Sequence, residues 1–449
     1  MISKARKSVL KINNSTIINF IFILFFHTIF AFILIFTYEN EIRFLDPLMK
    51  TWNMSPLGWA LLICISIIID FILLSLLFSQ RKGTVRPSDF FILFHCVFIL
   101  FPFLALHPVT GLVDDKMLFF ITIILVLPLF FLIFIRSKPF INFKKIKFLN
   151  SITINIFFIL IICLSVSVTL WNYNQSSSFD LESTSIKRIE SRAIYSEFFF
   201  FGYILNMTYN ALLPYLSFIS GLKKNIFLFF FIFFVGIYFF YIFGLKSVII
   251  NIVISFFLGI IINNKIKIKL LGFYFLGALF LLGFFLFMML YFFNYLSLAA
   301  DYFFRRIFAI QAQVSGYYFD FFWNDQKLIW SFLTGLQDPS LNYTYYMGEK
   351  YYNNPLMNVN TNTFVSKIME GGLLNYTYTL LIISFFFYLL DGYWLSTQNP
   401  SFLFIGFLFS ALIIEQSYTV AFLSSGVLLL FLFLIFEKVK NKKIIYYSQ

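Results

Sequence analysis

The chain has 449 residues, of which 61% are hydrophobic and only 12% carry a charge. Runs of roughly 20 apolar residues, the length that crosses a bilayer core of about 30 Å as a helix, recur along it. This composition excludes a soluble globular protein. The three cysteines each lie inside an apolar run, which argues against a metal site or a disulfide framework; they are Cys64, Cys96 and Cys163.

The apolar runs predict an all-α, polytopic membrane protein with about twelve transmembrane helices. The predicted spans in chain order are 16–37, 57–79, 90–106, 117–135, 151–171, 198–220, 226–243, 247–262, 270–293, 372–390, 401–414 and 418–436. The first run is too long for a cleavable signal peptide and is expected to remain as a span. The eleventh is short and has Glu415 beside it, which is compatible with a broken or re-entrant helix.

The distribution of lysine and arginine predicts the orientation, because cytoplasmic loops retain positive charge. With the N-terminus inside, most of the 33 basic residues fall in short cytoplasmic segments, and most of the 20 acidic residues fall outside. Both termini are therefore expected in the cytoplasm. The net charge of +13 follows from this topology, so a nucleic-acid partner is not expected.

Two predicted external segments are longer than a turn, and they divide the chain. Residues 1–293 form an N-terminal membrane domain of nine predicted spans, with an external loop at 172–197. Residues 294–371 form a large periplasmic loop, and residues 372–449 add three predicted spans and a cytoplasmic tail. A transporter needs no such large loop, whereas an enzyme acting on a lipid-linked polar substrate does.

The pair Arg305-Arg306 is the sharpest local signal in the large loop. Apolar residues recur at helical spacing from Tyr302 to Val314, which predicts a surface helix with Asp301 four residues before Arg305. Guanidinium groups bind phosphate oxygens in a bidentate manner, which suits a lipid pyrophosphate. The alternative is an interfacial helix whose arginines only reach toward lipid headgroups.

Two further basic residues are candidate pyrophosphate ligands on the external side. Arg192 lies just before the sixth predicted span, where it either binds a ligand or pairs with neighbouring glutamates. Lys246 lies in the short turn between the seventh and eighth predicted spans, where it either extends to the membrane surface or faces an anionic ligand. The Gly-x4-Gly-Lys frame of a P-loop is missing.

The carboxylates of the large loop are candidate general bases for a sugar hydroxyl. They are Asp301, Asp320, Asp325, Asp338, Glu349 and Glu370. Sequence alone does not choose among them, and a carboxylate in a long loop is most often simply solvated. Asp320, which lies among aromatic residues, and Glu370, at the start of the tenth predicted span, are preferred. Asp70, inside the second span, is either structural or ligand-facing.

Aromatic and amide side chains of the same loop are candidate glycan ligands. Tyr317, Tyr318 and Trp323 are suited to stacking on sugar rings, although Tyr and Trp also gather at membrane interfaces. Asn360 and Asn362 either bond sugar hydroxyls or cap the helix that follows.

In these features the chain resembles the Wzy-type O-antigen polymerases, the oligosaccharide repeat-unit polymerases of bacterial surface-polysaccharide pathways. The resemblance covers the whole topology, with about a dozen spans, both termini inside and two external loops, the larger one late in the chain. Arg305 is followed after ten residues by Gly316, the Arg-x10-Gly pattern of some members, whereas nine residues separate Arg192 from Gly202. Phe243-Gly-Leu-Lys-Ser-Val248 is similar to the family's short basic turn.

The resemblance implies a membrane glycosyltransferase with a GT-C-like core in the bacterial inner membrane, with its active site facing the periplasm. The growing glycan on undecaprenyl pyrophosphate would be transferred to a hydroxyl of a new lipid-linked repeat unit. The pyrophosphate would be bound by Arg192, Lys246, Arg305 and Arg306, and a carboxylate would orient or deprotonate the acceptor. No cofactor is implied. The implied partners are the lipid-linked substrates, membrane lipid, a chain-length regulator and a flippase.

Two alternatives come from related pathways. An O-antigen ligase usually carries a histidine in its large external loop, and none of the three histidines of this chain lies there. A lipid-linked oligosaccharide flippase also fits twelve spans and a basic chain. Flippases, however, have short loops and a charged central cavity, whereas the charge inside the predicted spans is nearly confined to Asp70.

Overall fold

The computed structural model describes residues 14–42, 56–81, 85–110, 115–136, 149–172, 199–264, 270–293, 298–324 and 343–438. Within these ranges the chain is almost wholly helical, and eight helices are long and apolar enough to cross a membrane. Two shorter apolar helices lie at Ile63–Leu77 and Ser401–Glu415. The prediction of an all-α polytopic membrane protein is therefore confirmed. The predicted external loop at 172–197 falls almost entirely outside the described residues.

The helices and strands lie in the following order. They are α1 (Asn14–Asn40), α2 (Pro56–Arg81), α3 (Pro87–Phe94), η2 (His95–Leu100), α4 (Phe101–Thr110), α5 (Asp115–Arg136), β1 (Leu149–Asn150), α6 (Ser151–Asn172), α8 (Phe199–Met207), η3 (Thr208–Leu212), α9 (Leu213–Lys223), α10 (Ile226–Phe243), α11 (Lys246–Asn263), α13 (Leu271–Phe293), α14 (Leu298–Ala300), η4 (Asp301–Ala309), α15 (Ile310–Asn324), α17 (Tyr343–Tyr352), α18 (Thr363–Thr397), α19 (Ser401–Glu415), α20 (Tyr418–Phe422), α21 (Val427–Ile435) and β2 (Glu437–Lys438). The η segments are π-helical turns that join their neighbours into longer helices.

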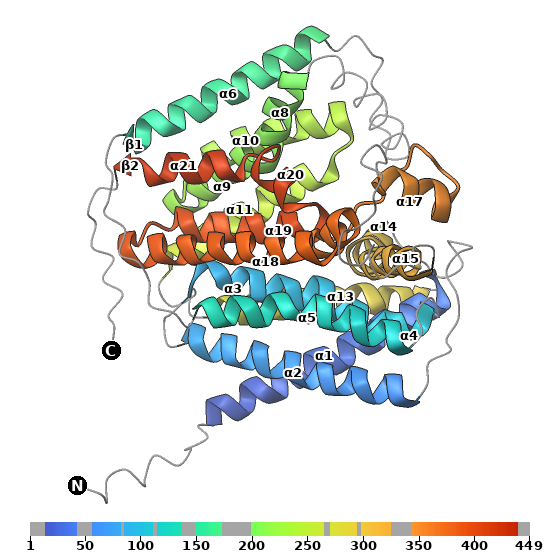
Figure 1. Cartoon of the computed structure of the whole chain (residues 1–449). Coiled ribbons are helices and arrows are strands. Elements are labelled where there is room, and N and C mark those ends of the chain that lie inside the picture. Colours follow the sequence, from blue (N-terminus) through green and yellow to red (C-terminus); the bar gives the residue numbers. More distant parts are fainter. Residues whose placement is uncertain are drawn as a thin grey trace, which may run out of the picture.

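The continuous helix α3–η2–α4 forms the centre of the bundle. Its apolar stretch Pro87–Leu106 is 94% buried, whereas that of α13, at the periphery, is only 22% buried. Both stretches are about equally apolar, so the difference comes from their neighbours: α3 packs against α2, α18 and α19. Figure 1 shows α2, α3, α5 and α18 running side by side.

Small residues bring α9 and α11 into backbone contact. A Cβ added at Gly221 would lie 2.2 Å from the Phe256 carbonyl oxygen, and one added at Gly259 would lie 2.3 Å from the Phe218 carbonyl oxygen. Glycine at both positions therefore allows the two helices to approach closely, as small residues do in membrane helix pairs. Ser217 adds an interhelical hydrogen bond by donating from Oγ to the Ile252 carbonyl oxygen at 2.7 Å.

The C-terminal spans differ from the prediction. The eleventh predicted span is an unbroken helix, α19, and the break comes after it. The segment 418–436 is not one helix but α20 and α21, because Ser417 starts a new helix as its N-cap and Gly426 takes a left-handed conformation at φ 80°. A Cβ at Gly426 would meet the Met207 Cγ at 2.3 Å, so glycine is required there for space as well as for conformation.

The predicted helix between Tyr302 and Val314 is confirmed, and it packs more deeply than a surface helix. It runs through η4 into α15, and Phe303, Phe304 and Phe308 are buried. The reason is its apolar face, which meets α1, where the Phe308 ring lies 5.0 Å from that of Phe30. Figure 1 shows α15 end-on, across the direction of α18 and α5, with α17 beside it and the β1–β2 pair at the opposite end of the bundle.

Candidate active site

The helix α18 begins with a side-chain cap. Asn362 is 2% exposed, and its Oδ1 accepts hydrogen bonds from the backbone N–H groups of Phe364 and Val365 at 3.2 and 3.1 Å. Its Nδ2 lies 3.3 Å from the Ser315 hydroxyl of α15, to which it donates. Of the two roles predicted for Asn362, this structure contains the helix cap. Asn360, two residues earlier, is exposed.

The same helix is broken at two consecutive glycines. Gly371 has φ −146° and ψ 24°, and Gly372 has φ 60° and ψ −157°. The second conformation is essentially restricted to glycine, because any Cβ would clash with the backbone. The break separates a short first segment, residues 363–370, from the long apolar segment that follows. It leaves Glu370 as the last residue of the first segment.

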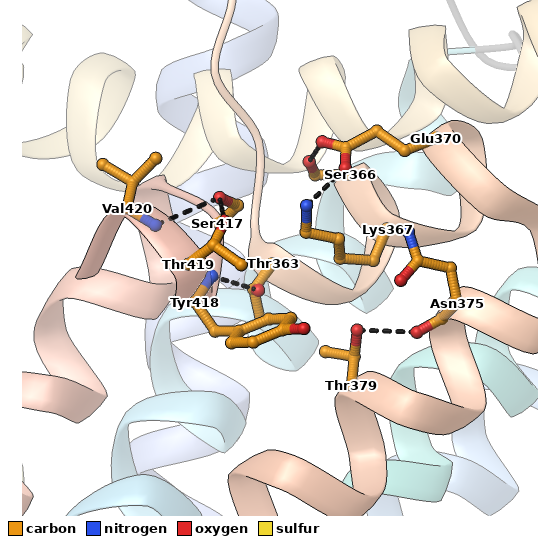
Figure 2. Close-up of polar contacts among 10 residues, drawn as sticks. All are labelled: Thr363, Ser366, Lys367, Glu370, Asn375, Thr379, Ser417, Tyr418, Thr419 and Val420. Carbon is orange, nitrogen blue, oxygen red and sulfur yellow. Dashed lines mark hydrogen bonds and ion pairs between the residues drawn. The ribbon is translucent and has the colours of Figure 1, made fainter. Parts of the chain in front are cut away.

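An ion pair and a hydroxyl hold the Glu370 carboxylate at this break. The Lys367 ammonium binds one carboxylate oxygen, and the Ser366 hydroxyl donates to the other at 3.0 Å. The Lys367 side chain is 10% exposed and the Glu370 side chain 36% exposed. Figure 2 shows the ammonium between the carboxylate and the ring of Tyr418, whose centroid is 5.7 Å from Lys367 Nζ. The buried cation therefore fixes a carboxylate that solvent can reach.

The first turn of α20 closes the other side of this arrangement. The Tyr418 backbone N–H donates to the Thr363 hydroxyl at 2.8 Å, and Ser417 Oγ accepts from the Val420 N–H. Both contacts are drawn in Figure 2. The start of α18 and the start of α20 are thus tied together, so the ring of Tyr418 is placed by backbone hydrogen bonding.

Helix α15 lies against the segment that leads into α18. The Tyr318 hydroxyl donates to the Val359 carbonyl oxygen at 2.8 Å, and Ser315 Oγ lies 3.3 Å from Thr361 Oγ1. Burial raises the pKa of Tyr318, and the negative charge of Glu370 raises it further. Helix α15 and the start of α18 are therefore joined by buried polar contacts.

The second preferred carboxylate, Asp320, lies in a tyrosine cluster between α15 and α17. It accepts a hydrogen bond from the Tyr351 hydroxyl at 2.9 Å, and the ring of Tyr351 stacks on that of Tyr317 at 4.5 Å. Burial raises the pKa of Tyr351, with Asp320 as the next cause, so its hydroxyl remains a donor. Lys350 lies over the Phe321 ring at 4.5 Å, and burial lowers its pKa against the opposing effect of Asp320.

Arg305 and Asp301 form the ion pair that their spacing of four residues predicts. Both guanidinium contacts go to the same carboxylate, and Arg305 Nη2 lies 2.7 Å from Asp301 Oδ2. The two side chains are 24% and 21% exposed, and Arg306 is exposed.

Lys246 begins α11, whose main neighbours are α9 and α10, and it is half-buried. Arg192 lies outside the described residues.

The predicted glycan ligands have different surroundings. The rings of Tyr317 and Tyr318 are each 1% exposed, and Gln313 Nε2 donates to the Tyr317 hydroxyl at 2.5 Å. In this conformation both rings are part of the packed interior. Trp323 lies in α15, and its side chain is outside the described residues. Among those of the five predicted glycan ligands whose side chains are described, Asn360 is exposed and the other three are buried.

Sequence reasoning missed Lys367, Ser366 and Tyr418. The spacing of Lys367 and Glu370, three residues apart on a helix, was the available signal for the ion pair. Tyr418 carried no such signal, because it is brought to Lys367 from a different helix.

Among the described residues no group of three histidine, cysteine, aspartate or glutamate side chains forms a metal site. Comparisons of the chain with protein-family models, curated proteins and solved structures find no match.

Proposed function

We propose that this chain is a membrane glycosyltransferase that polymerises undecaprenyl-pyrophosphate-linked oligosaccharide repeat units into a surface polysaccharide of the O-antigen type. The proposal rests on the resemblance to Wzy-type polymerases and on one structural observation. That observation is the Glu370 carboxylate, which is reachable by solvent, oriented by Ser366 and Lys367, and placed at a break in a membrane helix. An ionisable residue within a membrane helix is by default a candidate functional residue.

In the proposed reaction Glu370 is the general base. It accepts the proton of the terminal sugar hydroxyl on the incoming lipid-linked repeat unit. The hydroxyl oxygen attacks the anomeric carbon of the growing glycan, a new glycosidic C–O bond forms, and the bond to the pyrophosphate oxygen breaks. Undecaprenyl pyrophosphate leaves with the bonding electron pair. Lys367 orients the carboxylate, and Asp320 remains the second candidate for the base.

Arg305 and Arg306 are the proposed ligands of the leaving pyrophosphate. They lie on η4, which continues directly into α15, the helix that contacts the cap of α18. Positive charge aimed at a leaving group that gains negative charge stabilises the transition state. Asp301 already binds Arg305 through two nitrogens, so the pyrophosphate would either share Arg305 with the Asp301 carboxylate or displace that carboxylate. Arg192 and Lys246 are further proposed ligands.

Deleting the gene provides the first test. A polymerase deletion is expected to leave surface glycan that carries a single repeat unit, with translocation of the lipid-linked unit intact. Complementation with Glu370→Gln should not restore long chains, because a positioned general base contributes about 10²- to 10⁴-fold to the rate. Glu349→Gln is the matched control, since Glu349 is an exposed carboxylate of α17.

The same assay identifies the base. If Glu370→Gln still makes long chains and Asp320→Asn does not, the general base is Asp320. Long chains from both variants would exclude Glu370 and Asp320 as the base. Arg305→Gln should also abolish elongation while the protein is still made in the membrane, and normal chains from that variant would exclude Arg305 as a pyrophosphate ligand.

A second candidate function, the flippase, is favoured by a different pair of residues. His27 Nδ1 in α1 lies 2.9 Å from Asp70 Oδ1 in α2, and both side chains are largely buried. A protonatable pair inside a helical bundle is a common feature of coupled transporters. If the chain translocates its substrate, Asp70→Asn should cause lipid-linked repeat units to accumulate on the cytoplasmic face. A polymerase would instead retain translocation in that variant.

A further inference from the structure

A second feature, separate from the candidate active site, is a groove between α2, α3 and α5. It has a volume of about 640 Å³, within the range of about 300 to 1,000 Å³ that is typical of ligand sites. Its walls are apolar, with Phe71 and Ile72 from α2 and Phe130 and Ile133 from α5. Phe71 is 56% exposed and Phe130 48% exposed, so the groove opens on the outer surface of the bundle. In a membrane this surface faces lipid.

Two arginines line the same groove. Arg86 precedes the first residue of α3, and Arg136 is the last residue of α5. Burial lowers the pKa of Arg86, and the positive charge of Arg136 lowers it further, whereas the negative charges of Asp391 and Asp89 raise it. Asp391 and Asp89 offset part of the repulsion between the two arginines, and an anion bound between them would offset it further.

Buried acceptors hold the arginine end of the groove in place. Arg136 Nη1 lies 2.5 Å from Asp89 Oδ1, and Asp89 Oδ2 accepts from the Arg86 backbone N–H at 3.0 Å. Asp391 accepts from both the backbone N–H and the hydroxyl of Ser88, at 2.9 and 2.6 Å. A guanidinium has five N–H donors, so the ion pair between one nitrogen of Arg136 and Asp89 leaves the group able to bind a second anion.

An apolar groove that opens to lipid and has paired arginines at one end matches the chemistry of one kind of molecule. We propose that the groove binds an anionic glycerophospholipid, with the phosphate between Arg86 and Arg136 and an acyl chain along Phe71, Ile72, Phe130 and Ile133. Arginine binds phosphate in a planar, bidentate geometry, and the apolar walls replace part of the lipid environment of the chain.

The place of the groove in the fold separates it from the candidate active site. Helix α3 begins at the end of the bundle opposite α15 and α17 (Figure 1). By the distribution of basic residues this end is predicted to be cytoplasmic, so the lipid would come from the inner leaflet. Basic pockets between membrane helices at this face bind anionic headgroups in other proteins. The inference does not depend on the proposed polymerase activity, because its readout is lipid binding.

Native mass spectrometry of the purified full-length chain tests the proposal. Phosphatidylglycerol and phosphatidylcholine are added at equal concentrations, and retained adducts are counted. We expect one retained phosphatidylglycerol, preferred over phosphatidylcholine. Arg86→Gln should weaken it about tenfold or more, because a charge-assisted hydrogen bond is worth about 1.5 to 3 kcal/mol. Lys224→Gln, which removes an exposed charge outside the groove, should retain it.

A second variant keeps the test valid if Arg86→Gln perturbs folding. Ser75→Trp fills the groove from α2 while leaving both arginines in place, and it should also displace the lipid. Equal retention of both lipids by the wild-type chain, or unchanged retention by Ser75→Trp, would overturn the proposal. So would protection from thermal unfolding by inorganic phosphate as strong as that by phosphatidylglycerol, because the site would then be for a free anion.

Discussion

Lys367 and Glu370 form an ion pair within the last turn before α18 breaks at Gly371. The cation of this pair is buried and the anion is partly exposed. A purely structural pair would gain little from this asymmetry, since exposed ion pairs contribute at most about 1 kcal/mol. The proposed role of Glu370 as a general base would use this asymmetry, because the buried cation orients the carboxylate while its exposed side stays open to substrate.

The first prediction concerns the cation. Lys367→Met should leave the protein folded, because an apolar side chain suits the buried position and the Glu370 carboxylate left behind is partly exposed to solvent. Chain elongation should nevertheless fall at least about tenfold, since the Glu370 carboxylate loses the charge that orients it. Lys367→Arg, which keeps the charge, should restore part of the activity. Glycan length on gels and melting temperature in detergent separate the two effects, and full elongation by Lys367→Met would exclude the positioning role.

The second prediction concerns the break itself. Gly372→Ala should destabilise the protein by about 1 to 3 kcal/mol, because φ 60° with ψ −157° is available essentially only to glycine. The matched control is Gly277→Ala in α13, where an added Cβ meets no atom within 4 Å. That control should raise the stability slightly, since glycine costs a helix about 0.5 to 1 kcal/mol relative to alanine. A melting temperature for Gly372→Ala equal to that of the control would contradict the strained conformation.

Hydropathy and local spacing predicted much of the fold, because both depend on residues close in the chain. The apolar runs identify the membrane class, and the i,i+4 relation of Asp301 and Arg305 anticipates their ion pair. The split of 418–436 at Gly426 was not predicted, since apolar residues continue across it and the left-handed Gly426 lies against Met207 of a different helix.

The candidate site was less predictable, because its contacts join residues that lie far apart in the chain. Tyr317 and Tyr318 are residues of the type that stacks on sugar rings, yet both are buried. An aromatic ring suits the packed interior as well as a sugar-binding surface, so residue type alone does not distinguish the two. Glu370 could be shortlisted from its place at the start of a span. Its relation to Tyr418 depends on the turn between α19 and α20, which no local pattern encodes.

The third prediction tests the contact between α9 and α11. Gly259→Ala should destabilise the bundle, because the new Cβ would lie 2.3 Å from the Phe218 carbonyl oxygen and 2.9 Å from the Leu222 nitrogen. Both are backbone atoms, so the helices must separate and the Ser217 hydrogen bond to Ile252 would lengthen. Thermal melting in detergent, again against Gly277→Ala, provides the measurement. No loss of stability in Gly259→Ala would show that the two helices are not in backbone contact.

The fourth prediction concerns pH. Glu437 lies in β2, where it accepts a hydrogen bond from Asn399 Nδ2 at 2.9 Å. Burial raises the pKa of Glu437 above its ordinary value of 4.5, and the hydrogen bond from Asn399 and the charge of Lys223 oppose that rise. The folded state therefore binds the proton more tightly than the unfolded state does. Stability should fall as the pH rises from 4.5 through the higher folded pKa, and the cost should persist above it.

Glu437→Gln removes this cost, since the amide oxygen can still accept from Asn399 but carries no charge. Its melting temperature should equal that of the wild type below pH 4.5 and exceed it above the raised pKa. Glu349→Gln, at an exposed carboxylate of α17, should show no such pH-dependent difference. Melting curves in detergent from about pH 4 to about pH 8 make the comparison. Parallel curves for the wild type and Glu437→Gln over that range would mean that burial does not penalise the charged form, and the β1–β2 contact would then be open to water.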